Sequence, residues 1–374
     1  MGVLEDGAGG PVTQQDSATA GEVAAFSTAA GLSEKSNDSV RKTSRPEAKD
    51  PIKVSDKVVI IEGDVSRGTG FLCSTEGALW LYTAAHVISG NKSIKVRDQK
   101  DNRYQSFELM QVADGVDLVR LKITGSDVQG LKLESPEVSA EIGEEISAVG
   151  NSDGTGVIAV ESGEIRGKGP DSWEISNEII PGNSGGPVVA KKNQKVIGIV
   201  THLLLGKKET WAADTRFANV RRFAARLDRP YTWTTVTPAR FLKEFQIIDE
   251  LDQNTKMGYA VLTVFYEAFE RPSRIPRTQP LSEEEMAVEN WKKEARVLVN
   301  NHPNHKVVST YNRILQRNSN YNQVENRREL HRSISSSLGL KGNIIKPDAF
   351  SWYHRESYRQ SIEWRQRLLA LANE

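Results

Sequence analysis

A serine set among glycines is the feature of this sequence whose chemistry follows most directly. It lies in the heptad Pro181-Gly182-Asn183-Ser184-Gly185-Gly186-Pro187. Glycine reaches backbone torsions closed to residues with a Cβ, so the Gly182 N–H can turn toward a point shared with the Ser184 N–H. Two such donors stabilise the charge that develops on a carbonyl oxygen under attack. We therefore expect Ser184 to be a nucleophile and Gly182, Asn183 and Ser184 to form an oxyanion hole.

A serine hydroxyl needs an adjacent base near neutral pH, and the base needs a third group to fix its tautomer. Upstream, an apolar run ends in small residues and His86. Between that run and Ser184, apolar and charged residues alternate from Asp117 onward, as in a half-buried strand. The order His, Asp, Ser is that of the chymotrypsin-type triad. Asp114 precedes the same strand and is the alternative, but Asp117 opens the alternating run, so we favour Asp117.

These motifs resemble those of trypsin-like serine peptidases of clan PA, nearest to the bacterial HtrA-like branch. The Asp-aliphatic-aliphatic pattern at Asp117 is also typical of that family. Over roughly residues 55–228, further segments are similar to family strands and motifs: Gly68–Leu72, Thr83–Val87, Val149–Ser152, Glu161–Ile165 and Lys195–Thr201. The resemblance implies a chymotrypsin-like double six-stranded β-barrel. His86 and Asp117 would come from the first barrel and Ser184 from the second, with the active site in the cleft between them.

The resemblance also suggests where the P1 side chain of a substrate would bind. Glu178 lies six residues before Ser184, where trypsin-like enzymes place the floor of the P1 pocket. A carboxylate there would attract Lys or Arg. The HtrA-like branch uses apolar residues instead, which Ile179 and Ile180 would supply. His202, just after Thr201, could favour an acidic P1 residue, and Glu178 could also be a solvated loop carboxylate. We favour a basic P1 residue by a narrow margin.

Composition narrows the class of protein. The chain has 374 residues, 38% of them hydrophobic and 26% charged, with a formal net charge of zero. No run approaches the ~18 apolar residues that a membrane span needs, and the first residues do not resemble a secretory signal. The single cysteine, Cys73, excludes an intramolecular disulfide framework, which is typical of intracellular proteins. We therefore expect a cytoplasmic protein without membrane partners, metal or cofactor.

The organisation along the chain predicts three parts. Residues 1–50 lack an apolar pattern and are expected to be disordered. Residues 51–234 form the mainly β, trypsin-like protease domain. Residues 235–374 are expected to form a mainly α-helical accessory domain with helices at 238–251, 282–300, 307–315, 325–338 and 357–372. The helix at 282 should open with a capping box, because Glu285 follows Ser282 by three residues.

Two hypotheses about function follow. The leading one is an intracellular serine endopeptidase that acts on proteins or peptides, with residues 235–374 recruiting a regulatory partner. The alternative is a catalytically silent scaffold on a peptidase fold. In that case the basic, aromatic-rich helical domain would bind a protein or nucleic acid. Nucleic acid is disfavoured because no binding motif accompanies the charge. The scaffold is disfavoured because no triad member is missing.

Overall fold

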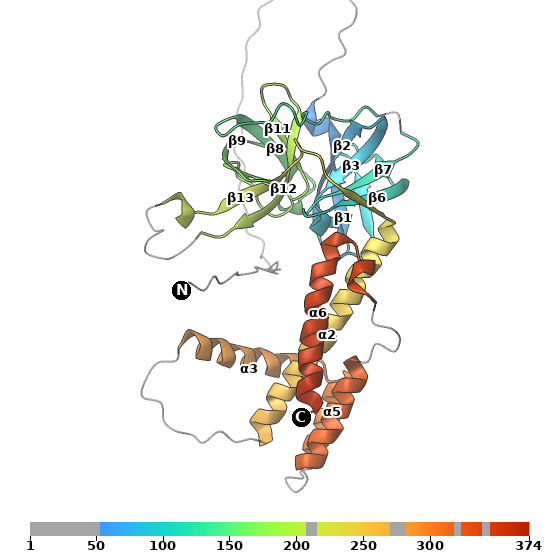
Figure 1. Cartoon of the computed structure of the whole chain (residues 1–374), viewed down its shortest axis with the longest axis vertical. Coiled ribbons are helices and arrows are strands. Elements are labelled where there is room, and N and C mark those ends of the chain that lie inside the picture. The colour runs from blue at the N-terminus through green and yellow to red at the C-terminus, as the bar shows by residue number, and fades with distance from the viewer. Residues whose placement is uncertain are drawn as a thin grey trace, which may run out of the picture. The chain divides into compact units, whose positions relative to one another are not determined.

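The structure is a computed structural model that describes residues 53–126, 128–206, 215–269, 282–317, 323–338 and 345–373. All of them lie in one compact unit, Pro51–Glu374. The segment 1–50, predicted to be disordered, lies outside the described residues. The order of elements is strands first and helices last (Figure 1). The strands are β1 Val58–Gly63, β2 Arg67–Thr75, β3 Ala78–Thr83, β4 Ile94–Arg97, β5 Arg103–Tyr104, β6 Phe107–Ala113, β7 Val119–Ile123, β8 Glu145–Asn151, β9 Ile158–Lys168, β10 Ser172–Ile175, β11 Pro187–Ala190, β12 Val196–Leu204, β13 Arg221–Arg226 and β14 Trp233–Val236.

The first half of the β region is an open sheet of eight strands in the order β14-β6-β7-β3-β2-β1-β4-β5. The prediction of a closed six-stranded barrel is wrong for this half. To close a barrel of six strands, β6 would have to pair with β4. Each of these two strands pairs with a different strand instead. Residues 233–236 of β14 pair with 110–113 of β6, and β5 pairs with β4. The predicted boundary between the protease domain and the helical domain follows residue 234. Strand β14, Trp233–Val236, crosses this boundary.

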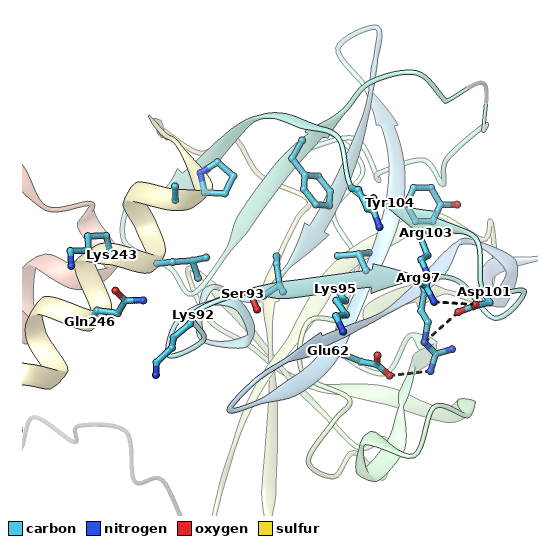
Figure 2. Close-up of a pocket in the computed structure, with 17 residues that line it drawn as sticks. Glu62, Lys92, Ser93, Lys95, Arg97, Asp101, Arg103, Tyr104, Lys243 and Gln246 are labelled. Carbon is cyan, nitrogen blue, oxygen red and sulfur yellow. Dashed lines mark hydrogen bonds and ion pairs between the residues drawn. The ribbon is translucent and has the colours of Figure 1, made fainter.

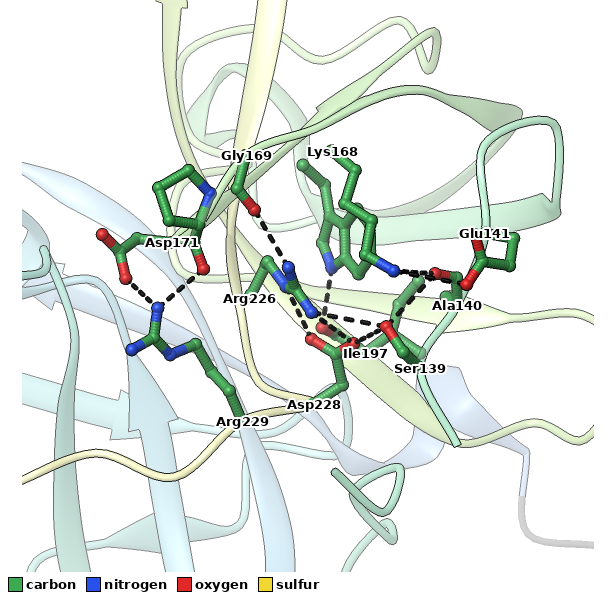
Figure 3. Close-up of polar contacts among 12 residues, drawn as sticks. Ser139, Ala140, Glu141, Lys168, Gly169, Asp171, Ile197, Arg226, Asp228 and Arg229 are labelled. Atoms are coloured by element: carbon green, nitrogen blue, oxygen red, sulfur yellow. Dashed lines mark hydrogen bonds and ion pairs between the residues drawn. The ribbon is translucent and has the colours of Figure 1, made fainter. Parts of the chain in front are cut away.

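The second half is a closed barrel of six strands in the order β10-β13-β12-β11-β8-β9, as predicted. Its core is built around Trp173, which is fully buried and donates from its indole N–H to the Ile197 carbonyl at 3.1 Å. The Arg226 guanidinium lies 4.4 Å from the centre of the Trp173 ring and pairs with the buried Asp228 at 2.9 Å. Figure 3 shows this network at the end of β13, where Arg226 also donates to the Gly169 carbonyl and to Ser139. A buried carboxylate is tolerated here because it is paired and hydrogen-bonded.

The helical region follows the prediction closely. Its helices are α2 Pro238–Phe269, α3 Glu283–Asn301, α4 Lys306–Gln316, α5 Gln323–Leu338 and α6 Trp352–Asn373. The predicted capping box between Ser282 and Glu285 is present. Helix α2 runs well past its predicted end at Leu251 and continues through Gly258. A Cβ at Gly258 would lie 2.5 Å from Leu368 of α6, so glycine permits the close approach of these two helices. No described helix has the length and apolar character needed to cross a membrane.

The helices share a core with the open sheet. Phe241 of α2 is fully buried in the cluster formed by Val59, Leu81, Leu121 and other residues of this sheet. Tyr353 of α6 packs against the same cluster. A second cluster, which includes Val261, Leu330 and Leu368, holds the helices to one another. The start of α2 and the start of α6 are therefore anchored in the sheet, while the rest of the helices pack on themselves.

Candidate active site

His86 lies on α1 (Ala85–Ile88), a one-turn helix directly after β3. Asp117 lies in the connection between β6 and β7, two residues before β7 begins. Strands β3 and β7 are paired, with Thr83 opposite Val119, so their adjacent ends bring the two side chains together. His86 Nδ1 is 2.6 Å from one Asp117 oxygen, and the His86 backbone N–H donates to the other at 3.0 Å. Asp117 thus holds both the ring and the backbone of His86.

Each member of this pair changes the pKa of the other. Burial by itself would lower the pKa of His86, but the Asp117 charge and hydrogen bond overcome it, so the pKa of His86 is raised. Burial would likewise raise the pKa of Asp117, but His86 and the backbone N–H groups lower it below its ordinary value. The carboxylate therefore stays ionised. The His86 side chain keeps 38% of its surface exposed, so its ring can be reached from solvent.

Asp114, the alternative aspartate, is placed elsewhere. It accepts a hydrogen bond from Thr234 Oγ1 at 3.1 Å, and its N–H donates to the Thr232 carbonyl at 2.9 Å. These contacts hold the start of β14 against the β6–β7 connection. Asp114 is therefore engaged in joining strands, whereas Asp117 contacts His86.

Ser184 lies in the tight turn that precedes β11. Its hydroxyl donates to the Thr201 carbonyl of β12 at 3.3 Å. The structure shows no hydrogen bond between Ser184 and His86 among the described residues. Catalytic hydrogen bonds are often loose without substrate and tighten in the complex.

The turn around Ser184 requires glycine. Gly182 has a φ of +92°, and a Cβ there would lie 2.2 Å from the Asn151 carbonyl oxygen. Among the described residues, neither the Gly182 N–H nor the Ser184 N–H has a hydrogen-bond partner. The Asn183 N–H, in contrast, donates to the Ile180 carbonyl at 3.1 Å. Asn183 therefore has no free backbone donor, and the candidate oxyanion hole narrows to Gly182 and Ser184.

The first sheet holds this turn through Thr69, a residue not predicted to belong to the site. Thr69 of β2 is fully buried, and its N–H donates to the Ser184 carbonyl at 2.8 Å. Its hydroxyl donates to the Gly182 carbonyl at 2.7 Å and accepts from the Asn151 N–H at 2.8 Å. Thr83, at the end of β3, donates to the Thr69 carbonyl at 2.7 Å. The signal that could have revealed this role is the threonine between two glycines in Gly68-Thr69-Gly70.

The residues expected to line a P1 pocket differ in their exposure to solvent. Ile179 is 3% exposed and belongs to the core of the second barrel, so its side chain is not available to a substrate. Glu178 and Ile180 are exposed. Thr201 is buried and supplies the carbonyl that Ser184 contacts. His202 is exposed to solvent on one side and stacks on Phe223. Partial burial of its ring and the nearby His86 lower the pKa of His202, whereas the charge of Asp117 acts to raise it.

Arg222 is a neighbour of this region that the sequence did not single out. Its Nε donates to the Ile179 carbonyl at 3.3 Å. A separate groove of about 700 Å³ lies between β4, β5 and the start of α2 (Figure 2). Lys92, Lys95 and Lys243 contribute to its walls. None of the candidate catalytic residues lines this groove.

Comparison with known proteins agrees with the predicted resemblance to trypsin-like peptidases. Residues 68–199 match the model of the trypsin-like peptidase domain. The chain is 29% identical over 181 residues to a probable periplasmic DegP-like serine endoprotease of Rickettsia conorii. This match covers 46% of the chain and 34% of the relative, so the chain spans about a third of that relative's length. Over this segment, the chain is similar to HtrA-like serine peptidases of the chymotrypsin fold, as its motifs predicted.

Two solved structures are also similar over 46% of the chain. One is the serine endoprotease of Yersinia pestis, with 23% identity, a TM-score of 0.36 and 59% of that chain covered. The other is the HtrA-type protease AlgW with a tripeptide, with 24% identity, a TM-score of 0.36 and 57% of that chain covered.

The comparison corrects the predicted cytoplasmic setting. The curated relative is a probable periplasmic enzyme, so the prediction has no support from similar proteins. Its physical basis was the single cysteine. A domain that buries an extensive core, such as the clusters of the two β halves, does not depend on disulfides for stability. Scarcity of cysteine therefore excludes a disulfide framework without deciding the compartment.

Proposed function

We propose that this chain is a serine endopeptidase that cleaves peptide bonds through an acyl-enzyme. Ser184 is the nucleophile, His86 the general base and acid, and Asp117 the residue that orients His86. The observation that carries the proposal is the double hold of Asp117 on His86, at 2.6 Å to the ring and 3.0 Å to the backbone N–H. An ionised carboxylate accepts hydrogen bonds only, so it keeps the proton on Nδ1 and leaves Nε2 free to accept one.

The proposed reaction begins when Ser184 Oγ turns from the Thr201 carbonyl toward His86. His86 Nε2 takes the hydroxyl proton as Oγ bonds to the substrate carbonyl carbon. The oxygen of the tetrahedral intermediate accepts hydrogen bonds from Gly182 and Ser184 N–H, two donors without a partner among the described residues. His86 then gives its proton to the leaving amine as the C–N bond breaks. A water molecule then loses a proton to His86 as its oxygen bonds to the acyl carbon. His86 returns the proton to Ser184 Oγ as the Oγ–C bond breaks and the acid product leaves.

A fluorophosphonate probe tests this proposal, because it bonds covalently to an activated serine. The wild type should be labelled, and Ser184→Ala and His86→Ala should not be. Ser162→Ala is the matched control, since it removes an exposed serine of the same barrel and should keep full labelling. Labelling that persists in Ser184→Ala, or a wild type that never reacts, would contradict the proposal. The catalytically silent scaffold receives no support from the comparisons.

Asp117 and Asp114 can be separated by activity. Asp117→Asn should lower kcat on the order of 10⁴-fold, as loss of the orienting acid does in such triads. Asp114→Asn should leave kcat within a few-fold, because its contacts are with Thr232 and Thr234. The opposite pattern would show that Asp114 is the third member.

For the P1 residue, we propose that His202 discriminates more strongly than Glu178. His202 lies close enough to the site for His86 and Asp117 both to affect its pKa. Glu178 is exposed and has no ion pair among the described residues, so water screens its attraction for Lys or Arg. A bound P1 carboxylate would raise the lowered pKa of His202 and pair with its imidazolium, so we expect an acidic P1 residue. A positional peptide library decides: cleavage after Lys or Arg supports Glu178 instead, and cleavage after Val, Ala or Leu supports neither charged residue.

A further inference from the structure

The one-turn helix α1 depends on its surroundings for its position. It has four residues, and a helix this short is not stable without tertiary contacts. On one side, the buried Asn91 side chain donates to the carbonyls of Val87 and Ile88 at 3.0 and 3.4 Å. Because His86 lies on α1, any contact that fixes α1 also fixes the candidate base.

A second contact to α1 comes from the helical region. Ser89, the residue that caps the C-terminus of α1, lies 2.9 Å from His354 Nε2 through its Oγ. His354 is on α6, is 2% exposed, and places its Nδ1 3.1 Å from Glu244 of α2. Glu244 also accepts from the Ser351 N–H at 3.0 Å, from the Ser351 hydroxyl at 2.6 Å and from Arg240 Nε at 3.2 Å. A continuous chain of hydrogen bonds thus joins α2 and α6 to α1.

The direction of these hydrogen bonds follows from the charge of Glu244. Burial would raise the pKa of this carboxyl, but hydrogen bonds from His354 and Ser351 lower it, so it is ionised and only accepts. His354 Nδ1 therefore donates, and in the neutral ring Nε2 accepts from the Ser89 hydroxyl. The order of groups is that of a Ser-His-acid triad. Ser89, His354 and Glu244 are only 8%, 2% and 5% exposed, however, so no substrate can reach them.

The same helices also pack against the core of the open sheet. The Phe241 ring lies 4.4 Å from the His354 ring, and Phe241 is part of the core of the open sheet. Tyr353, next to His354, packs against that core. Burial raises the pKa of Tyr353, and the charge of Asp117 raises it further. The start of α6 therefore contacts both the core of the open sheet and, through His354 and Ser89, the helix that carries His86.

We propose that Glu244 and His354 are positioning residues: they hold Ser89, and through it α1, so that the His86 ring stays aligned between Asp117 and Ser184. The helical region then has a role within the peptidase itself. This inference rests on the proposed function. A displacement of catalytic groups by about 1 Å can cost on the order of 10²-fold in rate. Binding of substrate should be affected much less, because none of these residues lies at the surface.

The first test separates kcat from KM on a peptide substrate. His354→Ala should lower kcat by about 10-fold or more, with KM within about 2-fold. Ser89→Ala removes only a hydroxyl from α1 and should lower kcat in the same direction. The double variant should be no worse than His354→Ala, because both changes break the same link. An unchanged kcat in both single variants would overturn the inference.

Two conservative variants identify which end of His354 matters. A glutamine side chain places a polar group near the position of Nε2 and can still meet Ser89. An asparagine places one near Nδ1 and can meet only Glu244. His354→Gln should therefore restore more of kcat than His354→Asn. The reverse order would show that the contact to Ser89 is not what positions α1.

A matched control and a signal that needs no turnover complete the design. His331→Ala removes another buried imidazole of the helical region, on α5, without touching α1, and should leave kcat unchanged. Proton NMR of the His86 Nδ1–H, which is strongly deshielded by its short bond to Asp117, should show a shifted or broadened signal in Ser89→Ala and His354→Ala only. An inactive wild type would refute the proposed function. The His86 NMR signal would then be the measurement that tests whether Glu244 and His354 position α1. A signal equal to that of the wild type in both variants would refute it.

Discussion

The His86–Asp117 pair shows how two side chains acquire the states that the proposed chemistry needs. Both carboxylate oxygens of Asp117 are engaged, one by the ring and one by the backbone N–H of His86. Rotation of either side chain would break at least one bond. The tautomer of His86 is therefore fixed before any substrate arrives, and this preorganisation is a large part of what such a site contributes to rate.

The rate should depend on pH through His86. Only the neutral imidazole accepts a proton, so activity is low when His86 is protonated and rises as the pH passes its pKa. Because Asp117 raises that pKa, the rise in kcat/KM should be centred above pH 6.5, the ordinary value for histidine. The measurement is a profile of kcat/KM from pH 5 to 9. A flat profile between pH 5 and 8 under chemistry-limited conditions would exclude His86 as the base.

Gly182 should be far more sensitive to substitution than a glycine with positive φ that lies in open space, such as Gly143. In Gly182→Ala, the new methyl group would lie 2.2 Å from the Asn151 carbonyl and would displace a candidate oxyanion donor. We expect kcat to fall by about 10²- to 10³-fold, as for loss of one such donor. Gly143→Ala is the control: its φ is +89°, but nothing lies within 4 Å of the added carbon. Similar losses in both variants would argue for general backbone strain.

At the scale of elements, β2 connects the two halves of the site. Thr69 forms hydrogen bonds with Ser184, Gly182, Asn151 and Thr83, which come from three separate segments of the chain. Gly185, with a φ of +85°, fits against the same residues, because a Cβ there would lie 2.1 Å from the Thr69 carbonyl. The turn that presents Ser184 is thus built on a strand of the first sheet.

Replacing Thr69 by its near-isostere valine should weaken both stability and catalysis. Thr69→Val leaves the Asn151 N–H and the Gly182 carbonyl without their partner, at a cost of about 1–3 kcal/mol for each group that stays buried. Denaturant unfolding measures the loss, and kcat should fall with it. Thr69→Ser keeps the hydroxyl and should retain most of both. If serine is no better than valine, the hydroxyl is not the reason for threonine here.

How far the sequence predicted these elements depends on the separation of the interacting residues. The strands and helices follow from local apolar periodicity, and the capping box at Ser282 is a four-residue pattern. The open first sheet could not be foreseen, because β14 pairs with a strand from much earlier in the chain. Ser89 and His354 are 265 positions apart and neither belongs to a recognisable motif. The prediction placed the Asn183 N–H in the oxyanion hole. Its hydrogen bond to the Ile180 carbonyl could not be foreseen, because that bond depends on turn torsions that the sequence does not specify.

For the molecule as a whole, the sheet and the helices are joined at Phe241. Its side chain is fully buried between Val236 and the strands of the open sheet, and it also contacts His354 and Tyr353. The helices beyond this point are held by their own cluster, which contains Leu262. Through Phe241, the stability of the helical region and the stability of the open sheet therefore depend on each other.

Substitution at this junction should uncouple the two regions. Phe241→Ala should cost about 3–5 kcal/mol, as for other buried phenylalanines, and should raise hydrogen exchange both in α1 and at the start of α6. Leu262→Ala should raise exchange in the helices and leave α1 unchanged. Hydrogen exchange followed by mass spectrometry, with peptides covering α1, α2 and α6, gives the measurement. Protection of α1 that is unaffected by Phe241→Ala would mean that the helices do not support it.

The pairing of β14 with β6 also has a consequence for biosynthesis. During translation, β6 emerges with its outer edge open, and that edge stays unpaired until the ribosome has added the whole second barrel and then residues 233–236. At about 5–20 residues per second this interval is on the order of ten seconds. An open strand edge invites pairing with other nascent chains. We expect the yield of soluble protein to fall when expression is fast or crowded, and to recover at low temperature or with added chaperone.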